Sequence, residues 1–190
     1  MRVAMLCVGV VLTLPLSAET PIHATARPGA TPPWDKGILP VNPERYYAAI
    51  ECGKQGGADP PCVFWDTGLC KNPDFTLAVY TGYKAVAYEV WQAVSHKQPA
   101  PQPNYQAAQQ TRVTIGITPV RGSTNTFTGL VLTRGGTAVP PVDRSLGSGG
   151  GRYTFDYPAF APTSGITLEL TGKTSTMSCV IDREVLAQFR

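Results

Sequence analysis

The sequence predicts a mainly β fold in which two antiparallel sheets pack together and one amphipathic helix packs against them. Three observations support this prediction. Short segments with a period-two apolar pattern recur along the chain, 14 threonines follow residue 110 of the 190, and a single segment has helical periodicity instead. Strands that are apolar on one side need a second layer to cover that side, so two packed sheets are expected.

The expected strands share alternation of apolar with polar or smaller residues. In the first, at 45–52, Tyr46, Ala48, Ile50 and Cys52 fall on one side. Further strands are expected at 75–80, 113–118, 127–133, 153–157, 166–171 and 177–181. From residue 111 onward the chain is predicted to be all β, with a flexible loop at 147–152 and a hairpin turn at 172–175.

The spacing of these strands indicates the type of sandwich. Their recurrence every 8 to 15 residues or so is typical of an immunoglobulin-like antiparallel β-sandwich. The spacing of Cys, Trp and Cys that marks antibody domains is absent from the sequence, so the comparison concerns architecture only.

The predicted helix lies near residues 83–96. Tyr83, Ala87, Val90, Trp91 and Val94 recur at helical spacing and form one apolar stripe. A proline-rich connector near 97–110 ends the helix, because proline cannot continue it. Five prolines in 27–44 predict an extended N-terminal segment, so the packed domain is expected to span 45–190.

Residues 1–26 are interpreted as a cleaved export signal. Arg2 precedes an apolar run of about 14 residues, shorter than the roughly 20 that a spanning helix needs, and a run of small residues ends at Ala26. Cleavage after Ala18 is the alternative, although Leu16 is bulkier than usual three residues before the cut. The chain is therefore expected to be secreted, periplasmic or in the cell envelope, with no transmembrane segment after cleavage.

Removal of the signal leaves four cysteines, which are Cys52, Cys62, Cys70 and Cys179. An even number of cysteines in an exported chain predicts two disulfides. Any complete pairing joins Cys179 to one of the three earlier cysteines and so ties the two halves together. Zinc is the alternative, but the spacing contains no C-x-x-C pair, and no metal ligand or cofactor is predicted.

The sequence does not predict a catalytic site. Its serines lack the G-x-S-x-G pattern, and His96 is expected to end the helix and not to act as a base. A Cys70–His96 couple is a weaker alternative. Eight carboxylates are candidates for acid–base pairs: Asp66, Asp74, Glu89, Asp143, Asp156, Glu169, Asp182 and Glu184.

Binding is the function that the sequence favours. A net charge of +3 is too small and too dispersed to predict a nucleic-acid partner. Tyr47, Tyr80 and Tyr88 fall outside the predicted apolar faces, where they are available to stack on sugars or to contact a protein. The hypothesis is an exported, non-catalytic binding, adhesion or assembly module of the cell envelope with a protein or polysaccharide partner. A hydrolase with paired carboxylates and an accessory subunit of a larger envelope complex are the alternatives.

Overall fold

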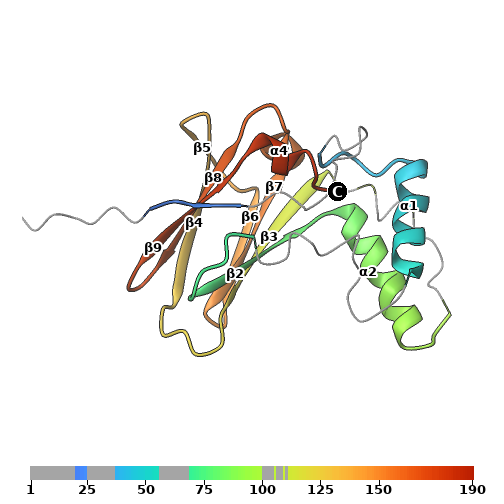
Figure 1. Cartoon of the computed structure of the whole chain (residues 1–190), viewed down its shortest axis with the longest axis horizontal. Coiled ribbons are helices and arrows are strands. Elements are labelled where there is room, and N and C mark those ends of the chain that lie inside the picture. The colour runs from blue at the N-terminus through green and yellow to red at the C-terminus, as the bar shows by residue number, and fades with distance from the viewer. Residues whose placement is uncertain (1–19, 25–36, 56–68, 100–104, 106–108, 110) are drawn as a thin grey trace, which may run out of the picture.

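A computed structural model describes residues 20–24, 37–55, 69–99, 105, 109 and 111–190. The strands among these residues form two sheets that pack face to face (Figure 1). The five-stranded sheet has the order β1-β9-β8-β4-β5, and the four-stranded sheet has the order β2-β3-β7-β6. Except for the parallel pair β1–β9, neighbouring strands are antiparallel. The prediction of a mainly β protein with two packed sheets is confirmed.

The strands have the following bounds. In the five-stranded sheet they are β1 (Ile22–His23), β4 (Phe127–Arg134), β5 (Thr137–Val139), β8 (Ile166–Gly172) and β9 (Thr176–Ile181). In the four-stranded sheet they are β2 (Phe75–Tyr80), β3 (Arg112–Pro119), β6 (Asp143–Gly147) and β7 (Gly150–Asp156). Each strand expected from residue 75 onward is present, with ends that differ by a few residues.

The core between the sheets is built from the inward residues of these alternating strands. Phe75, Phe155, Leu168 and Ile181 are almost completely buried there. Their outward neighbours, such as Thr76, Asp156 and Glu169, are half-buried or exposed. The alternation in the sequence therefore corresponds to burial on one face of each sheet.

The prediction of a strand at 45–52 is wrong, because these residues belong to helix α1 (Pro43–Lys54). Asn42 caps the helix by accepting a hydrogen bond from the Arg45 amide at 2.8 Å, and Pro43 occupies the first turn. A proline at this position loses no helical hydrogen bond, and its fixed φ angle suits the helix. The helix instead buries Tyr46, Ala49 and Cys52, which recur three residues apart and form one helical face.

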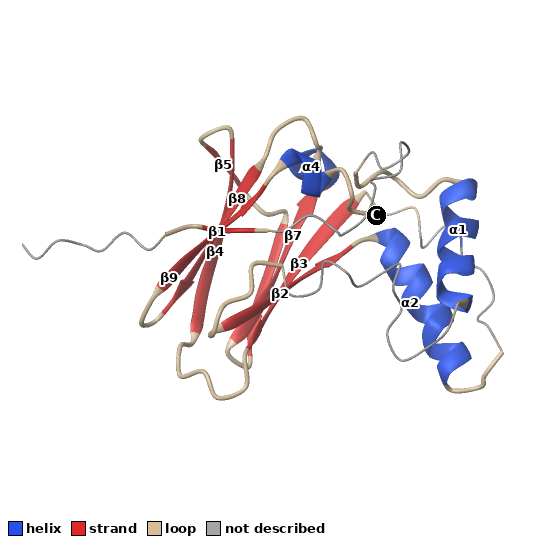
Figure 2. Cartoon of the chain, viewed as in Figure 1, coloured by secondary structure: helices blue, strands red, loops and turns tan. Residues whose placement is uncertain are grey.

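The predicted helix near 83–96 is confirmed as α2 (Gly82–Ser95), which follows β2 directly. Its N-cap is Thr81, whose hydroxyl accepts a hydrogen bond from the Lys84 amide at 3.2 Å. The two helices pack against each other in parallel at one end of the sandwich (Figure 2). Within the described residues, α1 therefore accompanies the sheets in addition to the one helix that the sequence predicts.

Two further expectations about the second half need correction. The segment is not all β, because it contains the short helices η1 (Tyr157–Phe160) and α4 (Arg183–Leu186). The expected loop at 147–152 is a tight turn between β6 and β7. Ser148 and Gly149 have φ angles of 50° and 79°, as hairpin turns that follow the twist of the strands require. The hairpin turn predicted at 172–175 is present between β8 and β9.

A disulfide joins the two sheets. Cys70, in the segment that leads into β2, is bonded to Cys179 in β9, with 5.7 Å between their Cα atoms and a sequence separation of 109. Cys179 is completely buried and Cys70 is 4% exposed, so the bond is part of the core. The expectation that Cys179 is tied to an early cysteine is confirmed.

Candidate functional site

The most distinctive surface is the outer face of the four-stranded sheet, here called the Tyr80 face. Because directly paired residues share a face, strand register defines its members. They are Thr76, Ala78 and Tyr80 of β2, Arg112, Thr114, Gly116 and Thr118 of β3, Arg152, Thr154 and Asp156 of β7, and Asp143 and Ser145 of β6. Threonine and serine hydroxyls are common among its small side chains, and charged side chains of both signs lie beside them.

Tyr80 is the large aromatic side chain on this face among the described residues. Its ring extends over the neighbouring strand at Gly116, where an added Cβ would lie 2.7 Å from Tyr80 Cε2. Glycine at this position therefore makes room for the ring. Tyr80 remains 49% exposed, so a large part of its surface is available for contact. The face thus combines an accessible aromatic ring with small neighbouring residues.

Polar groups lie beside the ring. Thr114, which is paired with Tyr80 in the sheet, has its Oγ1 3.0 Å from Oγ1 of Thr154 on the next strand. Farther along the same rows lie exposed Asp143 and Arg152. Hydroxyl groups donate and accept hydrogen bonds, the guanidinium donates, and the carboxylate accepts. The face can therefore bind a neutral, hydroxyl-rich ligand by stacking and hydrogen bonding.

A second polar cluster lies where three loops meet at one end of the sandwich. Asp74 accepts hydrogen bonds from Ser123 Oγ at 2.8 Å, Asn125 Nδ2 at 2.9 Å and Ser175 Oγ at 3.3 Å. Asn125 is 4% exposed and also accepts from the Thr174 amide at 3.1 Å. Donation from Asn125, then from Ser123, lowers the pKa of Asp74. This cluster joins loops from both sheets and is a structural link.

The cysteines are placed as follows. Cys70 and Cys179 form the bond described above, so neither is a thiolate nucleophile or a zinc ligand. Cys52 is also disulfide-bonded, and Cys62 lies outside the described residues. Within the described ranges no group of three or more His, Cys, Asp and Glu side chains is arranged to hold a metal ion.

His96 is where the sequence places it, at the C-terminal cap of α2. Its Nδ1 lies 2.8 Å from the Gln92 carbonyl oxygen, and its side chain borders a hollow of about 440 Å³ with Glu89 and Gln98. The suggested Cys70–His96 couple is contradicted, because Cys70 is in a disulfide.

The candidate carboxylates are distributed over the molecule. Asp74 belongs to the loop cluster, Asp156 is 3.9 Å from Arg112, and Asp182 is 3.6 Å from His23. Glu184 accepts from Arg183 at 2.6 Å, which lowers its pKa, whereas a general acid needs a raised one. Glu89, Asp143 and Glu169 are exposed, and Asp66 lies outside the described residues.

An apolar groove of about 620 Å³ lies where the segment before α1 meets the end of β7. Its lining includes Ile38, Leu39, Tyr157 and Pro158. Burial raises the pKa of Tyr157. No hydrogen-bond partner for the buried Tyr157 hydroxyl is found in the described part of the chain.

The other two tyrosines singled out from the sequence are on the helices. Tyr47 on α1 is 66% exposed and Tyr88 on α2 is 40% exposed, so all three predicted exposed tyrosines are confirmed. The sequence pattern did not indicate which of them has a site around it. That distinction comes from the neighbours of Tyr80, which belong to strands far apart in the sequence.

Membrane-spanning helices and similarity to known proteins are the two remaining features that bear on function. No helix in the described ranges combines the length and apolar character needed to cross a membrane. A comparison of the chain with protein-family models, curated proteins and solved structures finds no significant match.

Proposed function

We propose that the protein is an exported, non-catalytic binding module of the cell envelope that binds a polysaccharide on the Tyr80 face. The single observation that carries this proposal is the exposed Tyr80 ring above Gly116, with threonine hydroxyls beside it. An aromatic ring offers an apolar surface to the C–H groups of a sugar ring, while nearby hydroxyls exchange hydrogen bonds with its hydroxyl groups.

The composition of the face favours a polysaccharide over a protein. The centre of a protein interface is typically apolar, with several large side chains that fill pockets on the partner. Among its described residues the Tyr80 face has one large aromatic group, and around it lie Thr76, Thr114, Thr118 and Thr154. Short hydroxyl side chains lose little conformational entropy on binding and match a hydroxyl-rich polymer.

The proposal includes a location and a fold family. The export signal predicted at the N-terminus and the Cys70–Cys179 disulfide support a secreted or periplasmic location, since disulfides persist in oxidising compartments. Two packed sheets with a disulfide between them support an immunoglobulin-like sandwich, which we retain as part of the proposal.

The test is binding of the full exported chain to insoluble polysaccharides. Peptidoglycan sacculi, cellulose and chitin are incubated with the purified protein, and the bound fraction is measured after sedimentation. We expect saturable retention on one of them. Tyr80→Ala should weaken this binding about tenfold or more, because aromatic stacking on a flat ring contributes roughly 1–3 kcal/mol in the analogous case of nucleobases.

The matched control is Tyr47→Ala, which removes another exposed tyrosine that lies on helix α1 and not on the Tyr80 face. It should bind as the unaltered protein does, and neither variant should melt at a lower temperature by more than a few degrees. Analysis of the supernatant should detect no released sugar. Equal binding by Tyr80→Ala, retention on none of the polymers, or release of soluble sugar would each contradict the proposal.

A further inference from the structure

Strand β1 (Ile22–His23) lies inside the segment 1–26 that the sequence analysis interprets as a cleaved export signal. Its two residues pair in parallel with the edge of the five-stranded sheet, Ile22 opposite Cys179 and His23 opposite Val180. The Ala24 amide then donates to the Val180 carbonyl oxygen at 2.8 Å. The segment at 22–24 is thus hydrogen-bonded to the folded domain as its first strand.

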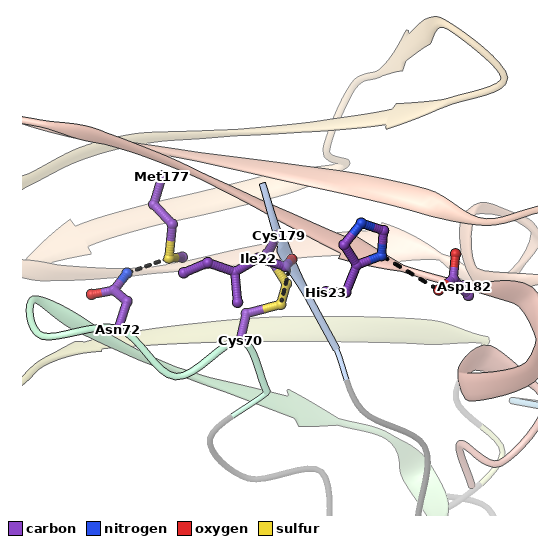
Figure 3. The surroundings of a disulfide bond; sticks show 7 residues. All are labelled: Ile22, His23, Cys70, Asn72, Met177, Cys179 and Asp182. Atoms are coloured by element: carbon purple, nitrogen blue, oxygen red, sulfur yellow. Dashed lines mark hydrogen bonds and ion pairs between the residues drawn. A yellow bond between two sulfur atoms is a disulfide. The ribbon is translucent and has the colours of Figure 1, made fainter. Parts of the chain in front are cut away.

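The side chains of this segment also belong to the domain. Ala24 is 6% exposed and is part of the sandwich core, and Ile22 packs against that core. Figure 3 shows Ile22 beside the Cys70–Cys179 disulfide, with its carbonyl oxygen 3.5 Å from Cys70 Sγ. On the other side of β1, His23 Nδ1 lies 3.6 Å from the Asp182 carboxylate (Figure 3).

Removal of β1 would therefore leave a defect in the fold. Backbone groups of Cys179 and Val180 would become an unpaired sheet edge, which favours aggregation. The apolar surface that Ile22 and Ala24 cover, next to a disulfide, would be exposed to water. Cleavage after Ala26 produces this state, whereas cleavage after Ala18 leaves the whole segment in place.

We infer that the signal peptidase cuts the precursor between Ala18 and Glu19, so that β1 remains on the exported protein as its first strand. This inference depends on the export that is part of the proposed function. The cut hydrolyses one peptide bond, with water as co-reactant. Ala18 and Ser17 provide small residues beside the bond, and Leu16 is the one departure from the usual small-residue pattern.

The test is the intact mass of the protein recovered from the periplasm of a Gram-negative host that expresses the full chain. We expect the mass of residues 19–190 with its disulfides oxidised. The mass of residues 27–190, which is eight residues shorter, would overturn the inference while leaving export established. Uncleaved precursor in the cytoplasm would overturn both the inference and the export, and any other cut C-terminal to Thr20 would overturn the inference alone.

Two matched variants locate the cut independently. Ala18→Arg places a large charged side chain next to the proposed cut and should raise the ratio of precursor to product about tenfold or more. Ala26→Arg makes the same change at the alternative position and should be processed like the unaltered chain. The opposite result would assign the cut to Ala26.

A third variant tests whether β1 contributes to the fold. The chain lacking residues 19–26, exported with the same signal, should melt about 5–10 °C below the unaltered protein, as the loss of a few kcal/mol implies for a domain of this size. An unchanged melting temperature would overturn the argument that the mature fold requires β1.

Discussion

The sandwich and the helix pair bury their residues in different ways. The sandwich core contains large side chains, among them Phe75, Phe155 and Leu168, that interdigitate between two sheets. The α1–α2 interface is a separate, smaller cluster built from alanines, tyrosines and Cys52. The two helices approach each other closely at Gly53, where an added Cβ would be 2.5 Å from the Ala87 carbonyl oxygen.

This difference predicts that the two regions differ in stability. Burial of apolar area is the main source of folding free energy, and the sandwich has much more of it. Regions with small cores open at lower free-energy cost than the rest of the molecule. The helix pair is therefore expected to unfold locally while the sheets remain intact, and changes to each region should have different consequences.

The largest effect is expected from removal of the bond between the sheets. The double change Cys70→Ala and Cys179→Ala should lower the free energy of unfolding by about 4 kcal/mol, since the bond closes a loop of 109 positions and the chain-entropy model gives roughly 4.7 kcal/mol for 100 residues. Urea unfolding measures this loss. Cys52→Ala serves as the comparison and should mainly accelerate amide exchange in α1 and α2. A loss below about 1 kcal/mol for the double variant would contradict the prediction.

A smaller effect is expected at this close approach of the helices. Gly53→Ala should destabilise by about 1–3 kcal/mol, because the new methyl group meets backbone and forces the helices apart. Hydrogen exchange should show lost protection in α1 and α2, with β3 and β7 unchanged. Gly129→Ala in β4 is the matched control, since its added Cβ has nothing within 4 Å. Uniform loss of protection in both regions would show that they unfold together.

Loss of the α1 cap should cost less. Asn42→Ala removes the acceptor for the Arg45 amide and should destabilise α1 by about 1 kcal/mol. Amide exchange in the first turn of α1 is the measurement. Asn42→Asp keeps an acceptor at the cap and should retain protection there. Equal protection in the alanine variant would mean that packing alone holds this end of the helix.

The smallest effect is the contribution of Asp74 to pH dependence. Hydrogen bonds from Asn125 and Ser123 hold its folded pKa below the ordinary value, so they stabilise the fold above the unfolded pKa of about 4 and are lost as the pH falls through the folded pKa. In urea titrations between about pH 5 and pH 2, Asp74→Asn should lose less stability than the unaltered protein. Identical pH profiles would contradict this assignment.

The strand prediction at 45–52 shows where sequence periodicity is ambiguous. Alternating apolar residues there fit a strand, but Tyr46, Ala49 and Cys52 also fit one helical face. Local signals of a helix start precede them, because Asn42, Pro43 and Glu44 are a cap, a first-turn proline and a first-turn acid. At this position the cap, the proline and the acidic residue indicate the secondary structure better than the alternation of apolar residues does.

Prediction succeeded where local pattern and burial agree, as in β2, β3, β8 and α2. The sequence also predicted that Cys179 pairs with an early cysteine, although only the fold selects Cys70. The Tyr80 face was not predictable, since the register of four strands brings Tyr80, Gly116 and Thr154 together. Likewise, the sequence shows no sign that Ile22 pairs with Cys179.

The bond between Cys70 and Cys179 also determines how the molecule responds to mechanical tension. When the two ends of the chain are pulled, the disulfide fixes the distance between Cys70 and Cys179, so the loop between these residues cannot be extended while the bond is intact. At about 3.3–3.6 Å per residue, roughly 360–390 Å of chain is thereby protected from extension. A protein held at one end under shear flow would therefore keep strands β2 to β8, which lie between the two cysteines, from being drawn out until that covalent bond was reduced.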